Sequence, residues 1–137
     1  MKIGKILIAA LMVSLFGAIF AGLTCGWLFN WVYKLEPVSV WKPMDGPPGL
    51  AFHIGGFLLN IILAVVYALL HKGIPVKNKL AKGAIFGLCA WAVGMLPGMF
   101  STYSFMTVAN GVVIYWTLLG LVEMPIKGLM IAAIYGE

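Results

Sequence analysis

Four long apolar runs constrain this fold more than any other feature of the sequence. They cover residues 6–29, 50–70, 81–100 and 112–135. A helix that crosses a hydrocarbon core of about 30 Å needs about 20 apolar residues, so each run can span a bilayer. The chain is also 63% hydrophobic and 9% charged, whereas a soluble domain is about half apolar and about a quarter charged. The sequence therefore predicts a multi-pass integral membrane protein.

The same runs predict transmembrane helices rather than the strands of a β-barrel. None of them alternates polar and apolar residues, as the strands of a membrane barrel do. In lipid, a spanning segment must satisfy its own backbone hydrogen bonds, and a helix does so. The predicted fold class is all-α, with a bundle of four transmembrane helices in a single membrane domain over residues 1–137. An outer loop at 31–49 and a basic loop at 71–82 join three of the helices.

The basic residues, all of them lysines, predict the orientation. Two precede the first helix and four lie in the 71–82 loop, whereas the two in the 31–49 loop are balanced by Glu36 and Asp45. Cytoplasmic loops are rich in lysine, so we expect both termini and the 71–82 loop in the cytoplasm. The net charge of +5 suits contact with anionic headgroups rather than with nucleic acid. We expect a bacterial or archaeal cytoplasmic membrane, with the lipid bilayer as a partner.

A charged pair in the last run is the strongest functional signal. Glu123 and Lys127 are four residues apart, which places them on one helix face in the favourable order for pairing. A charge at the helix centre costs roughly 2.5 to 3.5 kcal/mol on insertion scales, so it seldom faces lipid without a reason. Pro125 cannot donate a backbone hydrogen bond, which leaves the carbonyl of Leu121 free and predicts a kink.

Polar residues in the other runs fall at comparable depth. Asn60 lies about midway along the second run, Trp91 lies near the middle of the third, and Ser14 lies in the first, nearer the level of Lys127. We predict that they can join Glu123 and Lys127 in one polar cluster at the membrane midplane. Two interpretations stay open. The cluster is either a proton or solute site built on Glu123 and Asn60, or a neutralised pair that fixes helix orientation or holds a partner's helix.

Small residues mark the faces on which the helices are predicted to pack. They recur at spacings of three or four, which places them on one side of a helix and lets another backbone approach closely. The predicted packing residues are Gly83, Gly87, Gly94 and Gly98 in the third helix, Gly22 and Gly26 in the first, and Gly128 in the last. The pattern predicts tight packing within the bundle or between copies of the chain.

Motifs for metal, cofactor or catalytic chemistry are missing from the sequence. His53 and His71 stand about 27 Å apart at helical rise, so they cannot hold one haem iron between them. The sequence has no zinc-ligand spacing, phosphate loop or nucleophile elbow. We therefore predict no metal, no cofactor and no catalytic residue, and an enzyme is the least supported class.

Two functional hypotheses follow from these features. The first is a non-enzymatic membrane protein that self-associates or serves as a small accessory subunit, with other copies or other membrane subunits as partners. Its support is the small-residue faces, the internal ion pair and the short loops, which leave little other surface for recognition. The alternative is a small oligomeric transporter or channel for protons or a small solute, built around Glu123.

Overall fold

The computed structural model describes residues 1–43 and 45–136, and all regular secondary structure within them is helical. This confirms the all-α fold class. Four helical stretches are long and apolar enough to cross a membrane, namely Ile3–Leu28, Leu50–Gly73, Lys79–Phe105 and Asn110–Tyr135. Each extends a few residues beyond at least one predicted bound, because polar residues at the ends of the apolar runs continue the helices. Such a set of helices suggests a multi-pass membrane protein.

The four stretches are divided into regular helices and shorter turns. The α-helices are α1 (Ile3–Leu23), α2 (Leu50–Leu70), α3 (Lys79–Ala90), α4 (Leu96–Phe105) and α5 (Asn110–Tyr135). Wide π-helical turns extend α1 as η1 (Thr24–Leu28) and join α3 to α4 as η4 (Trp91–Met95). Tighter 3-10 turns are η2 (Asn30–Lys34), at the start of the long link, and η3 (His71–Gly73), after α2.

Local chemistry explains several of these boundaries. The Asn78 side chain caps α3 by accepting hydrogen bonds from the backbone N–H groups of Leu80 and Ala81, at 2.8 and 3.2 Å. Gly136 ends α5 in the left-handed region, at φ 83°, which glycine adopts without strain. The wide turn η4 lies just before Pro97, whose ring would clash with the preceding turn of a regular helix.

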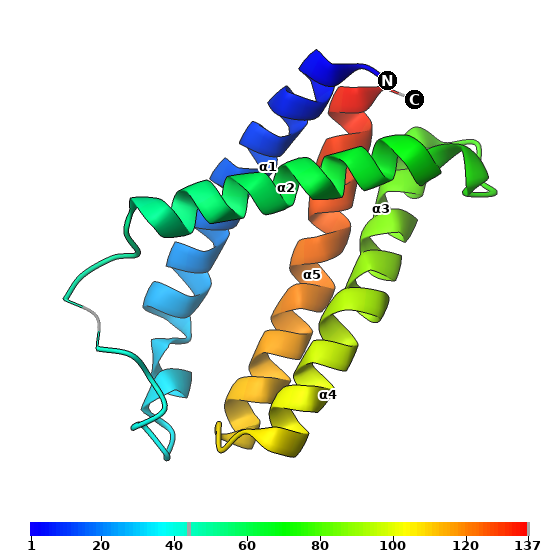
Figure 1. Cartoon of the computed structure of the whole chain (residues 1–137). Helices are drawn as coiled ribbons and strands as arrows, with labels where there is room; N and C mark the ends of the chain where they lie inside the picture. The colour runs from blue at the N-terminus through cyan, green and yellow to red at the C-terminus, as the bar shows by residue number, and fades with distance from the viewer. Residues whose placement is uncertain (44, 137) are drawn as a thin grey trace.

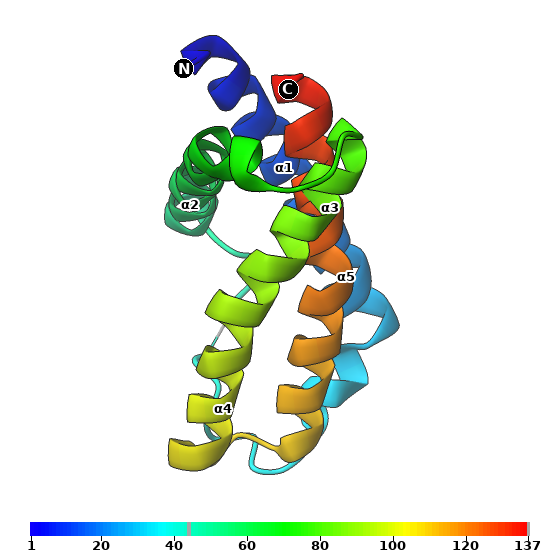
Figure 2. The ribbon, with the colours of Figure 1, turned by 90° about the vertical axis from the view of Figure 1, so that its right-hand side faces the viewer.

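The helices are arranged as three roughly aligned rods with one helix laid across them. Figure 1 shows α1, α5 and the α3–α4 rod running between the two ends of the molecule, while α2 runs across α1 and α5. Figure 2 views the same molecule from the side and shows α2 nearly end-on. A bundle of four aligned spans would place α2 alongside α1 instead. The termini and the α2–α3 link lie together at one end, and η2 and the α4–α5 link lie at the other.

The hydrophobic core lies at the end that carries the termini. Tyr67 of α2 is fully buried there, with ring centroids 5.3 Å from Phe86 of α3 and 6.1 Å from Tyr135 of α5. The buried members of this core are Ile6, Ala9, Val13, Ala64, Tyr67, Phe86, Ile131, Ala132 and Tyr135. Those from α2, Ala64 and Tyr67, both belong to its C-terminal half. The N-terminal half of α2 therefore extends beyond the core and is left to cover a cavity.

Contacts between the first and last helices close this end of the molecule. Lys5 Nζ donates a hydrogen bond to the carbonyl oxygen of Tyr135 at 3.2 Å. The Lys2 ammonium lies 5.8 Å from the centroid of the Tyr135 ring. A cation at a helix C-terminus interacts favourably with the unpaired carbonyls of the last turn, so both lysines stabilise the end of α5.

The structure divides the predicted packing glycines into two groups. A Cβ atom added at Gly83 would lie 2.6 Å from the Cβ atom of Ala132, and one added at Gly87 would lie 2.6 Å from the Cα atom of Pro125. Gly128 is equally enclosed by the α3 backbone. These three glycines let α3 and α5 touch backbone to backbone. By contrast, nothing lies within 4 Å of a Cβ added at any member of the second group, which is Gly22, Gly26, Gly94 and Gly98.

Candidate functional site

The charged pair of α5 is formed as a direct ion pair. Lys127 Nζ lies 2.6 Å from Glu123 Oε1, and the two side chains keep 15% and 23% of their surface exposed, respectively. A Cβ atom added at Gly17 of α1 would lie 3.5 Å from Lys127 Nζ and 3.6 Å from Glu123 Oε1. The pair therefore rests against the backbone of α1, at a position where glycine leaves room for it.

The packing of α5 determines which way this pair points. Met124 and Pro125 present backbone atoms to Gly87 of α3. Glu123 and Lys127 are one turn apart and share the other side of α5, which faces α1. α5 runs through Pro125 as a single helix from Asn110 to Tyr135, and the kink there stays a prediction.

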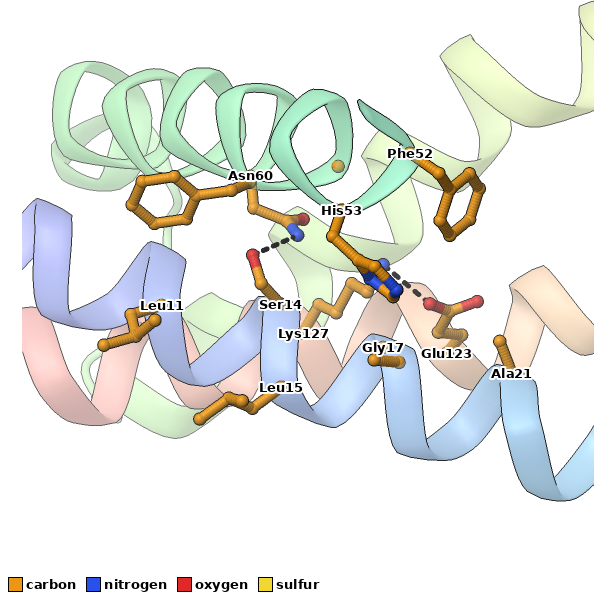
Figure 3. Close-up of a pocket in the computed structure, with 13 residues that line it drawn as sticks. Leu11, Ser14, Leu15, Gly17, Ala21, Phe52, His53, Asn60, Glu123 and Lys127 are labelled. Carbon is orange, nitrogen blue, oxygen red and sulfur yellow. Dashed lines mark hydrogen bonds and ion pairs between the residues drawn. The ribbon is translucent and has the colours of Figure 1, made fainter. Parts of the chain in front are cut away.

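A cavity of about 510 Å³ opens beside the ion pair, and we call it the inner cavity. Figure 3 shows its lining, with α1 and α5 below and α2 above. Its polar lining residues are Ser14, His53, Asn60, Glu123 and Lys127. The other lining residues are Leu11, Leu15, Gly17, Ala18, Ala21, Phe52, Gly56 and Phe57. A mostly apolar wall with a few converging polar groups is the usual composition of a small-molecule site.

A second polar contact lies in the inner cavity, between α1 and α2. Asn60 Nδ2 donates a hydrogen bond to Ser14 Oγ at 2.9 Å, and Ser14 Oγ donates one to the carbonyl oxygen of Ala10 at 2.7 Å. The structure thus brings Ser14, Asn60, Glu123 and Lys127 into one cavity, from three helices.

Trp91 lies apart from these four residues. Its indole Nε1 donates a hydrogen bond to the carbonyl oxygen of Thr117 on α5, at 3.0 Å. Together with Met95, its ring packs on Gly120, where an added Cβ atom would lie 3.2 Å from Trp91 Cδ1. The sequence places Trp91 at the right depth but does not show that it faces a different side of α5 from the ion pair.

His53 also lines the inner cavity, which its position in the sequence does not indicate. It belongs to the first turn of α2, and depth along a spanning helix would place it far from Glu123. Because α2 lies across α1, its first turn reaches the same cavity as the ion pair, and Figure 3 shows the imidazole of His53 pointing from α2 toward α1 and α5. An imidazole thus lines the same cavity as a carboxylate and an ammonium.

A larger cavity of about 1210 Å³, the outer cavity, adjoins the inner one beneath the link between η2 and α2. The two share Ala18, Ala21, Phe52 and His53 as lining residues. Trp41, Lys42 and Trp116 line the outer cavity but not the inner one. The two cavities therefore meet at His53 and at the three other lining residues that they share.

Aromatic rings fix the wall of the outer cavity. Trp116 Nε1 donates a hydrogen bond to Tyr33 Oη at 2.8 Å, and the Tyr33 ring lies 5.3 Å from the Trp41 ring. Burial, more than the neighbouring Cys25 thiol, raises the pKa of the Tyr33 phenol above its ordinary value. Tyr33 therefore stays neutral at physiological pH and serves as a hydrogen-bonding wall residue.

The chemistry available at the inner cavity is binding and proton exchange. A carboxylate and an ammonium can form charge-assisted hydrogen bonds with a polar solute, and such bonds are stronger than neutral ones. Within residues 1–43 and 45–136, no three His, Cys, Asp or Glu side chains are grouped so that they could hold a metal ion. Comparison with known proteins finds no matching family, curated relative or solved structure.

Proposed function

We propose that this chain is a non-enzymatic, multi-pass membrane protein that binds a small polar solute in the inner cavity and passes it across the bilayer. The observation that carries the proposal is that Glu123 and Lys127 form their ion pair at the edge of an open cavity between three helices. A purely structural pair gains most when packed side chains enclose it and satisfy its remaining hydrogen bonds. A pair that lines a cavity can instead exchange its partner for a solute.

We also propose that the end carrying the termini faces the cytoplasm of a bacterial or archaeal cell. Six lysines lie just before or in the first turn of α1, between α2 and α3, or in the first turn of α3, all at this end. A cysteine placed at Asn78 should then resist a membrane-impermeant thiol reagent added outside, while one at Ser39 should react. Both would be made in a Cys25→Ala, Cys89→Ala background, and outside labelling at Asn78 would reverse the orientation.

The transport proposal is tested with variants of the ion pair. Glu123→Gln leaves the Lys127 ammonium unpaired beside α1, so folded yield should fall. The double change Glu123→Gln, Lys127→Met removes both charges and should restore the yield. Solute flux should nevertheless drop by about tenfold or more, because a charged hydrogen bond to the bound solute is lost. Flux is measured in liposomes, with a pH-sensitive dye for protons and light scattering for acetate and glycerol.

The matched control for these variants is Glu36→Gln. The Glu36 carboxylate accepts a hydrogen bond from the backbone N–H of Val38 at 3.1 Å and lines neither cavity. Its removal should leave flux unchanged. Flux at the level of the unmodified chain in the double variant would eliminate the transport role, and a double variant as poorly folded as Glu123→Gln would eliminate the ion pair as a stabilising unit.

Assembly with other chains is a second candidate function, because at four of the seven predicted packing glycines no described residue lies within 4 Å of an added Cβ atom. Gly94 and Gly98, on the α3–α4 rod, are open and exposed. In a membrane, such faces favour the close approach of another helix. The native mass of the protein in mild detergent separates the two candidates. A monomer that still supports flux would oppose assembly, and a stable oligomer without flux would oppose transport.

A further inference from the structure

We infer that the outer cavity is a binding site for an anionic phospholipid, whose headgroup is held at Trp41 and Lys42 and one of whose alkyl chains lies along α1. The lipid comes from the leaflet at the η2 end of the molecule. This site goes beyond the proposed solute function and does not depend on it, because Trp41 and Lys42 line the outer cavity and not the inner one.

The proposed headgroup site contains a hydrogen-bond donor, the indole N–H of Trp41, that has no acceptor among the described residues. Trp41 Nε1 is also buried. The neighbouring indole differs, because Trp116 Nε1 already donates to Tyr33 Oη. A buried N–H that has left water without finding an acceptor is costly, so an acceptor atom inside the cavity would stabilise this arrangement. A phosphate oxygen supplies such an acceptor.

The charge of the lining favours an anion over a neutral or cationic headgroup. Lys42 follows Trp41 directly, lines the same cavity and carries a positive charge. None of the described residues that line the outer cavity carries a carboxylate. Glu36, in the same link, is engaged with the backbone N–H of Val38. Lysine near a membrane surface attracts anionic lipids, and a lysine beside a fixed N–H donor would hold one phosphate at two points.

The aromatic rings place this headgroup site at the level of a membrane surface. The Trp41 ring lies 5.3 Å from the Tyr33 ring and 5.8 Å from the Trp116 ring, so its N–H direction is fixed. Trp116 belongs to the first turns of α5, at the η2 end of the molecule. Tryptophan and tyrosine gather where the hydrocarbon core meets the headgroups, which is where a lipid phosphate lies.

The floor of the cavity suits an alkyl chain. Along α1 and η1 it is made of small side chains, and nothing lies within 4 Å of a Cβ atom added at Gly22 or Gly26. From Ala18 to Gly26 this trough extends for about 12 Å at helical rise. It runs from the aromatic rings toward His53, so a chain in it would lie along α1, as acyl chains lie in a leaflet.

Native mass spectrometry of the full chain tests the inference. The protein is released from mixed micelles that hold phosphatidylglycerol and phosphatidylcholine in equal amounts, and the lipid retained on the protein is counted. We expect one phosphatidylglycerol to be retained in preference to phosphatidylcholine. The double variant Trp41→Phe, Lys42→Gln should lose this preference by about tenfold, because it removes one N–H donor and one charge.

Matched variants separate this site from general lipid contact. Trp27 is 69% exposed and Lys34 is also exposed, and neither lines the outer cavity. Trp27→Phe, Lys34→Gln should therefore retain phosphatidylglycerol as the unmodified chain does. Gly22→Leu should reduce retention by filling the trough while the headgroup site stays intact. Soluble glycerol phosphate should not bind, because it lacks the alkyl chain.

Several outcomes would overturn the inference. Equal retention of the two lipids by the unmodified chain would show that the cavity does not select an anionic headgroup. Undiminished preference in the Trp41→Phe, Lys42→Gln variant would place the lipid elsewhere. If that variant folds poorly, as judged by its elution in detergent, Lys42→Gln alone replaces it and should still lower the preference. If Lys42→Gln retains as much phosphatidylglycerol as the unmodified chain does, that result would also contradict the site.

Discussion

The α3–α5 contact and the open face of the α3–α4 rod are built from the same residue type with opposite results. At Gly83 and Gly87, the backbone of α5 fills the space where a side chain would be. At Gly94 and Gly98, that space is empty. All four glycines lie on one stripe if the segment is a regular helix. A small-residue pattern therefore shows where another helix backbone can approach. Whether a helix does approach there depends on the surface of that neighbouring helix.

The wide turn η4 explains where the stripe leaves α5. η4 begins after Gly87, contains Gly94 and winds more slowly than an α-helix, which rotates the residues from Trp91 onward relative to those before it. Trp91 and Met95, four and eight residues after Gly87, consequently meet α5 at Gly120. Two bulky side chains packed on one glycine replace the backbone contact of the first part of the interface.

The largest effect should come from filling the tight contact. A leucine at Gly87 has to displace the backbone of α5 at Met124 and Pro125, so Gly87→Leu should abolish folded yield or cost more than about 3 kcal/mol in unfolding free energy. The same change at Gly94 should leave the unfolding free energy of the monomer nearly unchanged. Unfolding by denaturant in detergent measures both. Equal losses at the two sites would show that Gly94 also faces a tight contact.

An intermediate effect is expected at Gly120, where the neighbour is a flexible side chain. Gly120→Ala places a Cβ atom against Met95 and Trp91 and should cost about 1 to 3 kcal/mol. Adding Met95→Ala should recover part of that loss, because the thioether no longer occupies the space. A double-mutant cycle on the unfolding free energy measures this coupling. Strictly additive losses would mean that Met95 and Gly120 do not share the contact.

The smallest effects should come from the exposed surface of the same rod. Leu88 is 46% exposed, so Leu88→Ala should change the unfolding free energy by no more than about 0.5 kcal/mol. Gly98→Leu should be as well tolerated in the monomer but should reduce the mass of any oligomer built on this face. Native mass in mild detergent distinguishes the two variants. If the native mass of the oligomer is the same in Gly98→Leu, the oligomer is built on another surface.

Sequence alone could predict the helices because hydropathy and helix formation are local properties. It could not predict how the helices cross, since that depends on side-chain shape over residues far apart in the chain. The position of His53 is an example, because α2 lies across α1 and depth along α2 therefore does not give distance from Glu123. Ser14 and Asn60 do meet, because α1 and α2 cross where both are near their middles.

The hydrogen bond between Lys5 and Tyr135 joins residues 130 positions apart, and this has a consequence for biosynthesis. At about 5 to 20 residues per second, a ribosome takes on the order of ten seconds to make the chain between them. During that interval α1, α2, α3 and α4 exist with no α5 to pack against. The helix that carries the Glu123–Lys127 pair, α5, is therefore also the helix that completes the core. A chain whose synthesis stalls before α5 is made exposes Gly83 and Gly87 to any neighbouring helix.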